Sequence, residues 1–113
     1  MELKIKDKTF DFDCRLGTAI KIKSEFNKTY TEIINEIDKL DVNDMINLLY
    51  CGLNKNEVDK TEFRNYILDN CGMADLYDYI SWFIKQLQYP GLNEEEIEKK
   101  LLEKRQKAKK FQD

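Results

Sequence analysis

The sequence contains no histidine among its 113 residues. Histidine is the commonest general base and metal ligand in proteins, and the usual partner of a nucleophilic serine or cysteine. The chain also lacks the sequence patterns of a phosphate-binding loop, a dinucleotide-binding turn and an EF-hand. We therefore expect a protein that is not an enzyme, with no catalytic residues, no cofactor and no metal site.

Long apolar runs are missing as well. No stretch approaches the roughly 18 apolar residues of a membrane-spanning helix, and the opening "MELKIKDKTFDFD" lacks the apolar segment of a signal peptide. The net charge is −3, which argues against binding to a polyanion. We expect a cytoplasmic protein that binds neither a membrane nor nucleic acid.

Cysteine is scarce, and its three residues show no CxxC spacing. An odd number of cysteines fits reduced thiols better than a disulfide framework. Cys51 and Cys71 each precede a glycine, which predicts that both lie at helix C-termini. The helix dipole disfavours a thiolate there, so we expect structural rather than reactive cysteines.

The first 13 residues have the pattern of a β-hairpin. In "LKIKDKTFDFD" apolar and polar residues alternate on both sides of a short polar turn. This period of two predicts one buried face, which carries Leu3, Ile5, Phe10 and Phe12. A lone hairpin is marginally stable, so it must pack on other elements.

From residue 15 to residue 91 the apolar residues recur at helical spacing. Leu16, Ala19, Ile20, Lys23 and Phe26 share the first stripe. The weak break at 27–28 leaves open whether one long helix follows or two, the second capped by Thr29 or Thr31. The segment "DVNDMINLLYCGLN" has a wide apolar face and predicts a central helix.

Candidate caps mark the later helices. Asp41 and Thr61 are suitable N-caps, and Gly52 and Gly72 suit a left-handed position that ends a helix. In the helix after Gly72 the predicted buried stripe is Leu76, Ile80, Phe83, Ile84 and Leu87. The pair Pro90-Gly91 should end that helix.

The predicted fold class is thus α+β and mostly α-helical. An N-terminal hairpin (1–13) precedes a bundle of four to six helices (15–91), and together they form one globular domain over residues 1–92. Residues 93–113 form a charged helical arm, which Asn93 and Glu96 open as a capping box. Its acidic residues come first and its basic residues last, which complements the helix dipole.

The arm has only a narrow apolar stripe, made of Ile97, Leu101, Ala108 and Phe111 and interrupted by Lys104. Such a stripe is typical of a helix that docks on another helix or subunit. A solvated terminus and nucleic-acid binding through the basic end are the alternatives.

Aromatic residues gather around the only tryptophan, Trp82. They fit either core packing or an exposed face of the kind enriched at protein interfaces. The candidate partner-binding residues are Tyr77, Trp82, Tyr89, Leu101 and Phe111, and we expect them to bind a helix in a groove.

Residues 1–91 resemble the tail assembly chaperones of long-tailed, siphovirus-type phages that infect Gram-positive bacteria. The resemblance lies in the order of the hairpin "MELKIKDKTFDF", the helix "DVNDMINLLYCGL", the helix "TEFRNYILDN" and a helix with tyrosines and tryptophan. The segment "LLYCGL" is its most suggestive part. These are patterns of apolar residues, not catalytic signatures.

The resemblance implies a function and a setting. Such chaperones bind the tape measure protein and keep it soluble while the tail tube assembles around it. They act in the host cytoplasm and are absent from the mature virion. A longer form made by ribosomal frameshifting recruits the tail tube protein, and this chain would be the short form. A homo-oligomer is expected too. The alternatives are a head–tail or tail structural component of the virion, and a small nucleic-acid-binding regulator.

Overall fold

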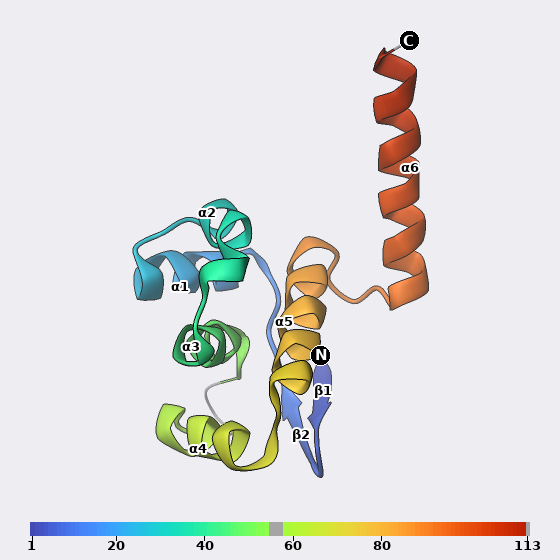
Figure 1. Cartoon of the computed structure of the whole chain (residues 1–113). Coiled ribbons are helices and arrows are strands. Elements are labelled where there is room, and N and C mark those ends of the chain that lie inside the picture. The colour runs from blue at the N-terminus through green and yellow to red at the C-terminus, as the bar shows by residue number, and fades with distance from the viewer. Residues whose placement is uncertain (55–57, 113) are drawn as a thin grey trace.

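The computed structural model describes residues 1–54 and 58–112, with side chains described up to Arg105 except at 55–57. In that part, a two-stranded antiparallel hairpin precedes six α-helices and one 3₁₀ helix (Figure 1), which confirms the predicted fold class. The elements are β1 (Glu2–Ile5), β2 (Lys8–Asp11), α1 (Leu16–Phe26), α2 (Tyr30–Asn35), η1 (Ile37–Lys39), α3 (Val42–Gly52), α4 (Lys60–Asn70), α5 (Met73–Gln88) and α6 (Glu94–Gln112).

The hairpin forms where the alternating pattern predicts it. Ile5 pairs with Lys8 around a two-residue turn, and Lys6 in that turn has a φ of 58°. Two-residue hairpin turns that match the strand twist require such a positive φ. Ile5 and Phe10 are buried on the predicted face, so register and burial agree.

The hairpin packs on α4 and α5. The ring of Phe10 lies edge-on to Phe63, with 5.4 Å between ring centroids, and near Tyr66 at 5.6 Å. The Tyr66 hydroxyl donates toward the Ile5 carbonyl oxygen, 2.8 Å away, and toward the Asp7 carboxylate. These contacts supply the support that an isolated hairpin lacks.

The first helical segment divides into two helices rather than one. Asn27 adopts a left-handed conformation with a φ of 54° and ends α1. The Thr29 side chain then caps α2 by accepting from the Glu32 amide, and the Glu32 carboxylate accepts from the Thr29 amide in return. Thr29, not Thr31, is therefore the cap.

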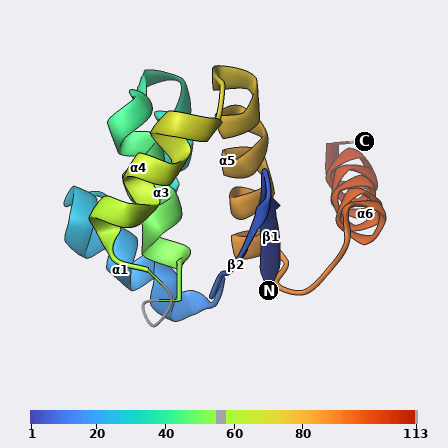
Figure 2. The same cartoon turned by 90° about the horizontal axis from the view of Figure 1, so that it is seen from below.

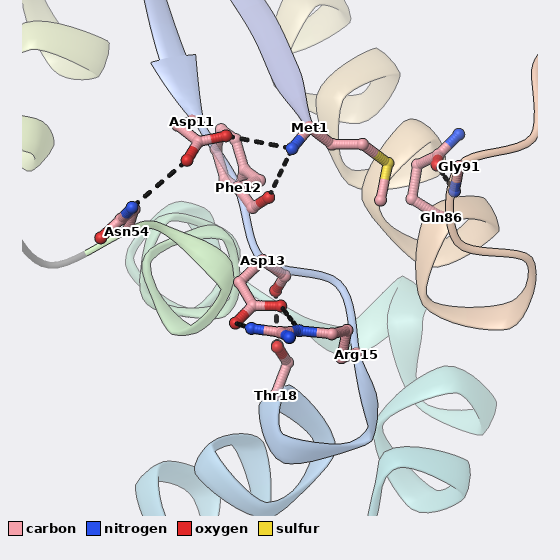
Figure 3. A network of polar contacts seen from close by, with 9 residues as sticks. All are labelled: Met1, Asp11, Phe12, Asp13, Arg15, Thr18, Asn54, Gln86 and Gly91. Atoms are coloured by element: carbon pink, nitrogen blue, oxygen red, sulfur yellow. Dashed lines mark hydrogen bonds and ion pairs between the residues drawn. The ribbon is translucent and has the colours of Figure 1, made fainter.

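The predicted stripe of α1 is not the buried face of the helix, because three of its residues, Leu16, Ile20 and Lys23, are exposed. Leu16 and Ile20 are 88% and 72% exposed, whereas Thr18 and Ile22 are buried. The Thr18 hydroxyl donates to the Asp13 carbonyl oxygen at 2.5 Å (Figure 3), which anchors the opposite face to the chain entering the helix. The helix carries apolar residues on two faces. The face of Thr18 and Ile22, which makes this tertiary contact, is the buried one.

The helix α3 is central, as predicted, since it contacts α1, α4 and α5. Asp41 caps it by accepting from the Asp44 amide at 2.8 Å, and the Asp44 carboxylate accepts from the Asp41 amide. Its buried side chains include Met45, Ile46, Leu48 and Leu49. Four adjacent apolar positions on a capped helix predict this placement from sequence alone.

Three of the predicted helix ends are wrong in detail. Gly52 is the last residue of α3, and Gly72 is the N-cap of α5 with a φ of −95°, so neither takes the left-handed stop position. The N-cap of α4 is Asp59 rather than Thr61, because the Asp59 side chain accepts from the Glu62 amide at 2.8 Å. Asp59 is an equally good cap, two residues earlier.

The last boundary confirms its sequence signals. The helix α5 ends at Gln88, before Pro90-Gly91. Asn93 accepts from the Glu96 amide at 2.8 Å, and the Asn93 amide donates to the Glu96 carboxylate at 3.4 Å, which is the predicted capping box. From there α6 projects beyond the body of the molecule (Figures 1 and 2). The predicted stripe residues Ala108 and Phe111 lie outside the described side chains.

Candidate functional site

An apolar groove of about 600 Å³ runs along α5. Its floor includes Tyr77, Ser81, Ile84 and Gln88, which follow one another at intervals of three and four residues. This spacing places them on one face of the helix. Tyr77 is 58% exposed, so an aromatic side chain stands open to solvent in the floor.

The walls of the groove come from three other elements. One wall consists of Ile37 and Asp38 of η1, Leu40, which follows η1, and the buried Met45 of α3. The other wall is Leu101 of α6. The 3₁₀ helix η1 follows α2 directly. Glu36, the N-cap of η1, donates its amide to carbonyl oxygens of α2. The groove is thus assembled from parts of the chain that lie more than 60 residues apart.

A buried glutamine holds the loop that positions α6. The Gln86 side chain donates to the Leu92 carbonyl oxygen at 2.8 Å. It also accepts from the Gly91 amide at 3.1 Å (Figure 3). Gly91 has a φ of 84°, a conformation that favours glycine. A weaker ion pair joins α5 and α6, with Lys85 Nζ 3.7 Å from Glu94 Oε1. Together these contacts fix the start of α6 beside the groove.

Replacing Gln86 with leucine is expected to lower the free energy of unfolding by about 1–2 kcal/mol, because two hydrogen bonds to the loop are lost. Amide hydrogen exchange at the start of α6 should become faster. Asn65→Leu is the matched control, since it makes a similar polar-to-apolar change at an exposed position of α4 and should stay within about 0.5 kcal/mol. Unchanged exchange in α6 would contradict the role given to Gln86.

The structure brings two of the five predicted partner-binding residues together. Tyr77 and Leu101 both line the groove. Trp82 lies elsewhere on α5, partly buried, with its ring edge-on to Phe12 at 5.5 Å. Tyr89 is the C-cap that follows α5 and is half-buried, and the side chain of Phe111 lies outside the described part.

Most of the groove was not anticipated from sequence. The apolar spacing predicts Ile37 and Leu40 on the apolar side of the helix that follows residue 28, and Ile84 in the buried stripe of α5. All three line the groove instead, and all three are partly buried. The spacing of Tyr77, Ser81 and Ile84 was a usable signal, but the walls depend on how distant elements pack.

The lining of the groove combines apolar side chains with a few polar groups. Burial raises the pKa of the Cys14 thiol to about 11 and also raises the pKa of Cys71, so neither thiol is activated as a nucleophile. Within residues 1–54 and 58–112, no three acidic or cysteine side chains gather in a way that could hold a metal ion. The groove offers apolar contacts, with polar groups from Asp38, Tyr77, Ser81, Lys85 and Gln88.

The same part of the chain has no helix that combines the length and the apolar character needed to cross a membrane. No model of a known protein family, no curated protein and no solved structure matches this chain.

Proposed function

We propose that this chain is a non-catalytic binding protein that takes up an apolar helix of a partner polypeptide in the α5 groove. More specifically, it is a phage tail assembly chaperone whose partner is the tape measure protein. The observation that carries the proposal is the 600 Å³ apolar groove with the exposed Tyr77 in its floor. Exposed aromatic side chains in apolar pockets are typical anchors of protein interfaces.

The dimensions of the groove suit a helix. From Tyr77 to Gln88 the floor covers 11 residue steps of α5, or about 16 Å, which equals roughly three turns of a bound helix. Apolar lining comes from Ile37, Ile80 and Leu101. A partner helix with apolar residues at positions i, i+3, i+4 and i+7 would place its apolar face against this lining.

The resemblance of residues 1–91 to tail assembly chaperones supplies the partner and the setting. The tape measure protein of that family is long, helical and hydrophobic, so it offers the kind of segment that the groove accepts. In this proposal the chain acts in the host cytoplasm and leaves before the virion is complete. A longer, frameshifted form would recruit the tail tube protein.

The test is co-expression of this chain with the tape measure protein encoded in the same genome. The tape measure protein is expected to be insoluble alone and soluble in complex. Tyr77→Ala should weaken the purified complex by at least about tenfold, as expected for an interface anchor. The matched control is Leu68→Ala, because Leu68 is similarly exposed, at 47%, but lies on α4 away from the groove; its affinity should stay within about twofold.

Three results would overturn the proposal. If the tape measure protein stays insoluble and no complex forms, the chaperone function is wrong. If the chain is found in purified virions, a structural role in the particle replaces it. If instead it binds DNA with steep salt dependence, a nucleic-acid-binding regulator is the better description.

A further inference from the structure

A second apolar surface lies on α1, outside the groove. Leu16 and Ile20 are separated by one helical turn and point the same way, and they are the two most exposed large apolar side chains of the described residues. Two such side chains on neighbouring turns form a small, continuous apolar patch. Neither lines the groove.

The patch on α1 has a basic flank. Lys23 lies on the same helix face as Ile20, three residues further along, and Lys21 lies beside it. Neither lysine has an ion-pair partner within 4 Å among the described residues, although Lys28 and Lys60 do pair with glutamates. An apolar patch with unpaired lysines suits an acidic amphipathic helix.

Part of the outward face of α6 has this chemistry, although Lys99 and Arg105 also flank Leu102 there. Leu102 is 56% exposed, and Glu95 and Glu98 lie on the same face, two turns and one turn before it. The buried Ile97 and the groove-lining Leu101 occupy the neighbouring face, which turns toward the body. The two faces of α6 therefore serve different contacts.

The helices α1 and α6 lie at opposite ends of the molecule in both views (Figures 1 and 2). A chain therefore cannot join its own α1 patch to its own α6. We propose that the outward face of α6 in one copy docks on the α1 patch of a second copy, with Leu102 against Leu16 and Ile20 and with Glu98 beside Lys23. The contact is head-to-tail, so it leaves one α1 patch and one α6 free at the ends of an open chain of copies.

The charges select an antiparallel arrangement of the two helices. With Leu102 beside Ile20, an antiparallel α6 places Glu98 near Lys23, since these residues lie four and three positions away from the apolar pair. A parallel α6 would place Arg105 near Lys23 instead, and like charges would oppose binding. The register follows from these two pairs.

The test is the molar mass of the purified full chain, measured by light scattering and sedimentation over a range of concentrations. The mass is expected to rise with concentration and to fall as salt is added. Ile20→Glu and Leu102→Glu should each return the chain to a monomer. Leu68→Glu is the control and should associate like the parent chain, since Leu68 is exposed on α4.

A charge exchange tests the register. Lys23→Glu and Glu98→Lys should each weaken association, because each places like charges together, and the double variant should restore it. Ile20, Lys23, Glu98 and Leu102 are all exposed, so the circular dichroism spectrum and the thermal unfolding midpoint of each variant should match those of the parent chain. A monomer at every concentration, or association that Ile20→Glu leaves intact, overturns the proposal. The measurement needs no tape measure protein, so its failure is separate from failure of the proposed function.

Discussion

Replacing Phe12 with alanine is expected to lower the free energy of unfolding by about 3–5 kcal/mol, the usual cost of removing a buried phenylalanine side chain. Domains of this size have roughly 5–15 kcal/mol in total. The variant should therefore be marginally stable or unfolded at room temperature. This is the largest single-residue effect that we expect.

Phe12 has this weight because it joins the hairpin to the helices. Its ring centroid lies 5.5 Å from that of Trp82, 6.1 Å from that of Phe83 and 6.5 Å from that of Phe63. Phe12 therefore contacts both α4 and α5. Its backbone also bridges to Leu53, just after α3. Removal of the ring opens a cavity where all of these elements meet, and few neighbours are free to fill it.

Urea unfolding measures the effect, followed by circular dichroism and by the fluorescence of Trp82, the only tryptophan. Phe12→Leu keeps much of the volume and should lose only about 1–2 kcal/mol. Leu68→Ala removes an exposed apolar side chain and should change stability by no more than about 0.5 kcal/mol. A Phe12→Ala chain as stable as Leu68→Ala would contradict this account of the core.

Replacing Gly52 with alanine is expected to lower the free energy of unfolding by about 2–3 kcal/mol through overpacking. A Cβ atom at this position would lie 2.3 Å from Cε1 and 2.7 Å from Cζ of Phe83, and 3.3 Å from the ring of Phe12. Both rings are fully enclosed. They cannot move aside without disturbing the packing of α5 on α3.

Gly17→Ala is the matched control for this prediction. Gly17 also lies in a helix, but a Cβ atom there would meet nothing within 4 Å. Alanine is the better helix former, so this variant should gain about 0.5–1 kcal/mol. Thermal unfolding of both variants gives the comparison. No loss of stability at Gly52 would show that helix propensity outweighs packing there, and a loss at Gly17 would contradict the gain expected from propensity.

These two glycines illustrate how far sequence patterns reach. The sequence predicts Gly52 only as a helix stop, because a sequence shows a missing side chain but not what lies opposite it. The need for glycine at position 52 arises from Phe83, which is 31 positions away. Only the packing of α3 on α5 makes that distance in sequence a distance of a few ångströms in space.

Buried polar residues show the same limit. Gln86 lies next to Phe83, Ile84 and Leu87 in a helix, and no local pattern marks it as different from an exposed glutamine. Its function in the fold depends on a loop five and six residues later that turns back over it. The predicted stripe therefore omits Gln86, the polar side chain that is buried among the described residues of α5.

The sequence by itself determined the local elements of this protein. Period-two alternation predicted the hairpin, and Asp41 and Asn93 predicted helix starts, because both signals act between residues a few positions apart. The tertiary structure decided which face of α1 is buried and which glycine has no room for a side chain. It also decided where Tyr77 and Leu101 meet in a groove. Each of these depends on contacts between distant segments, which local hydrogen bonding and hydrophobic spacing do not specify.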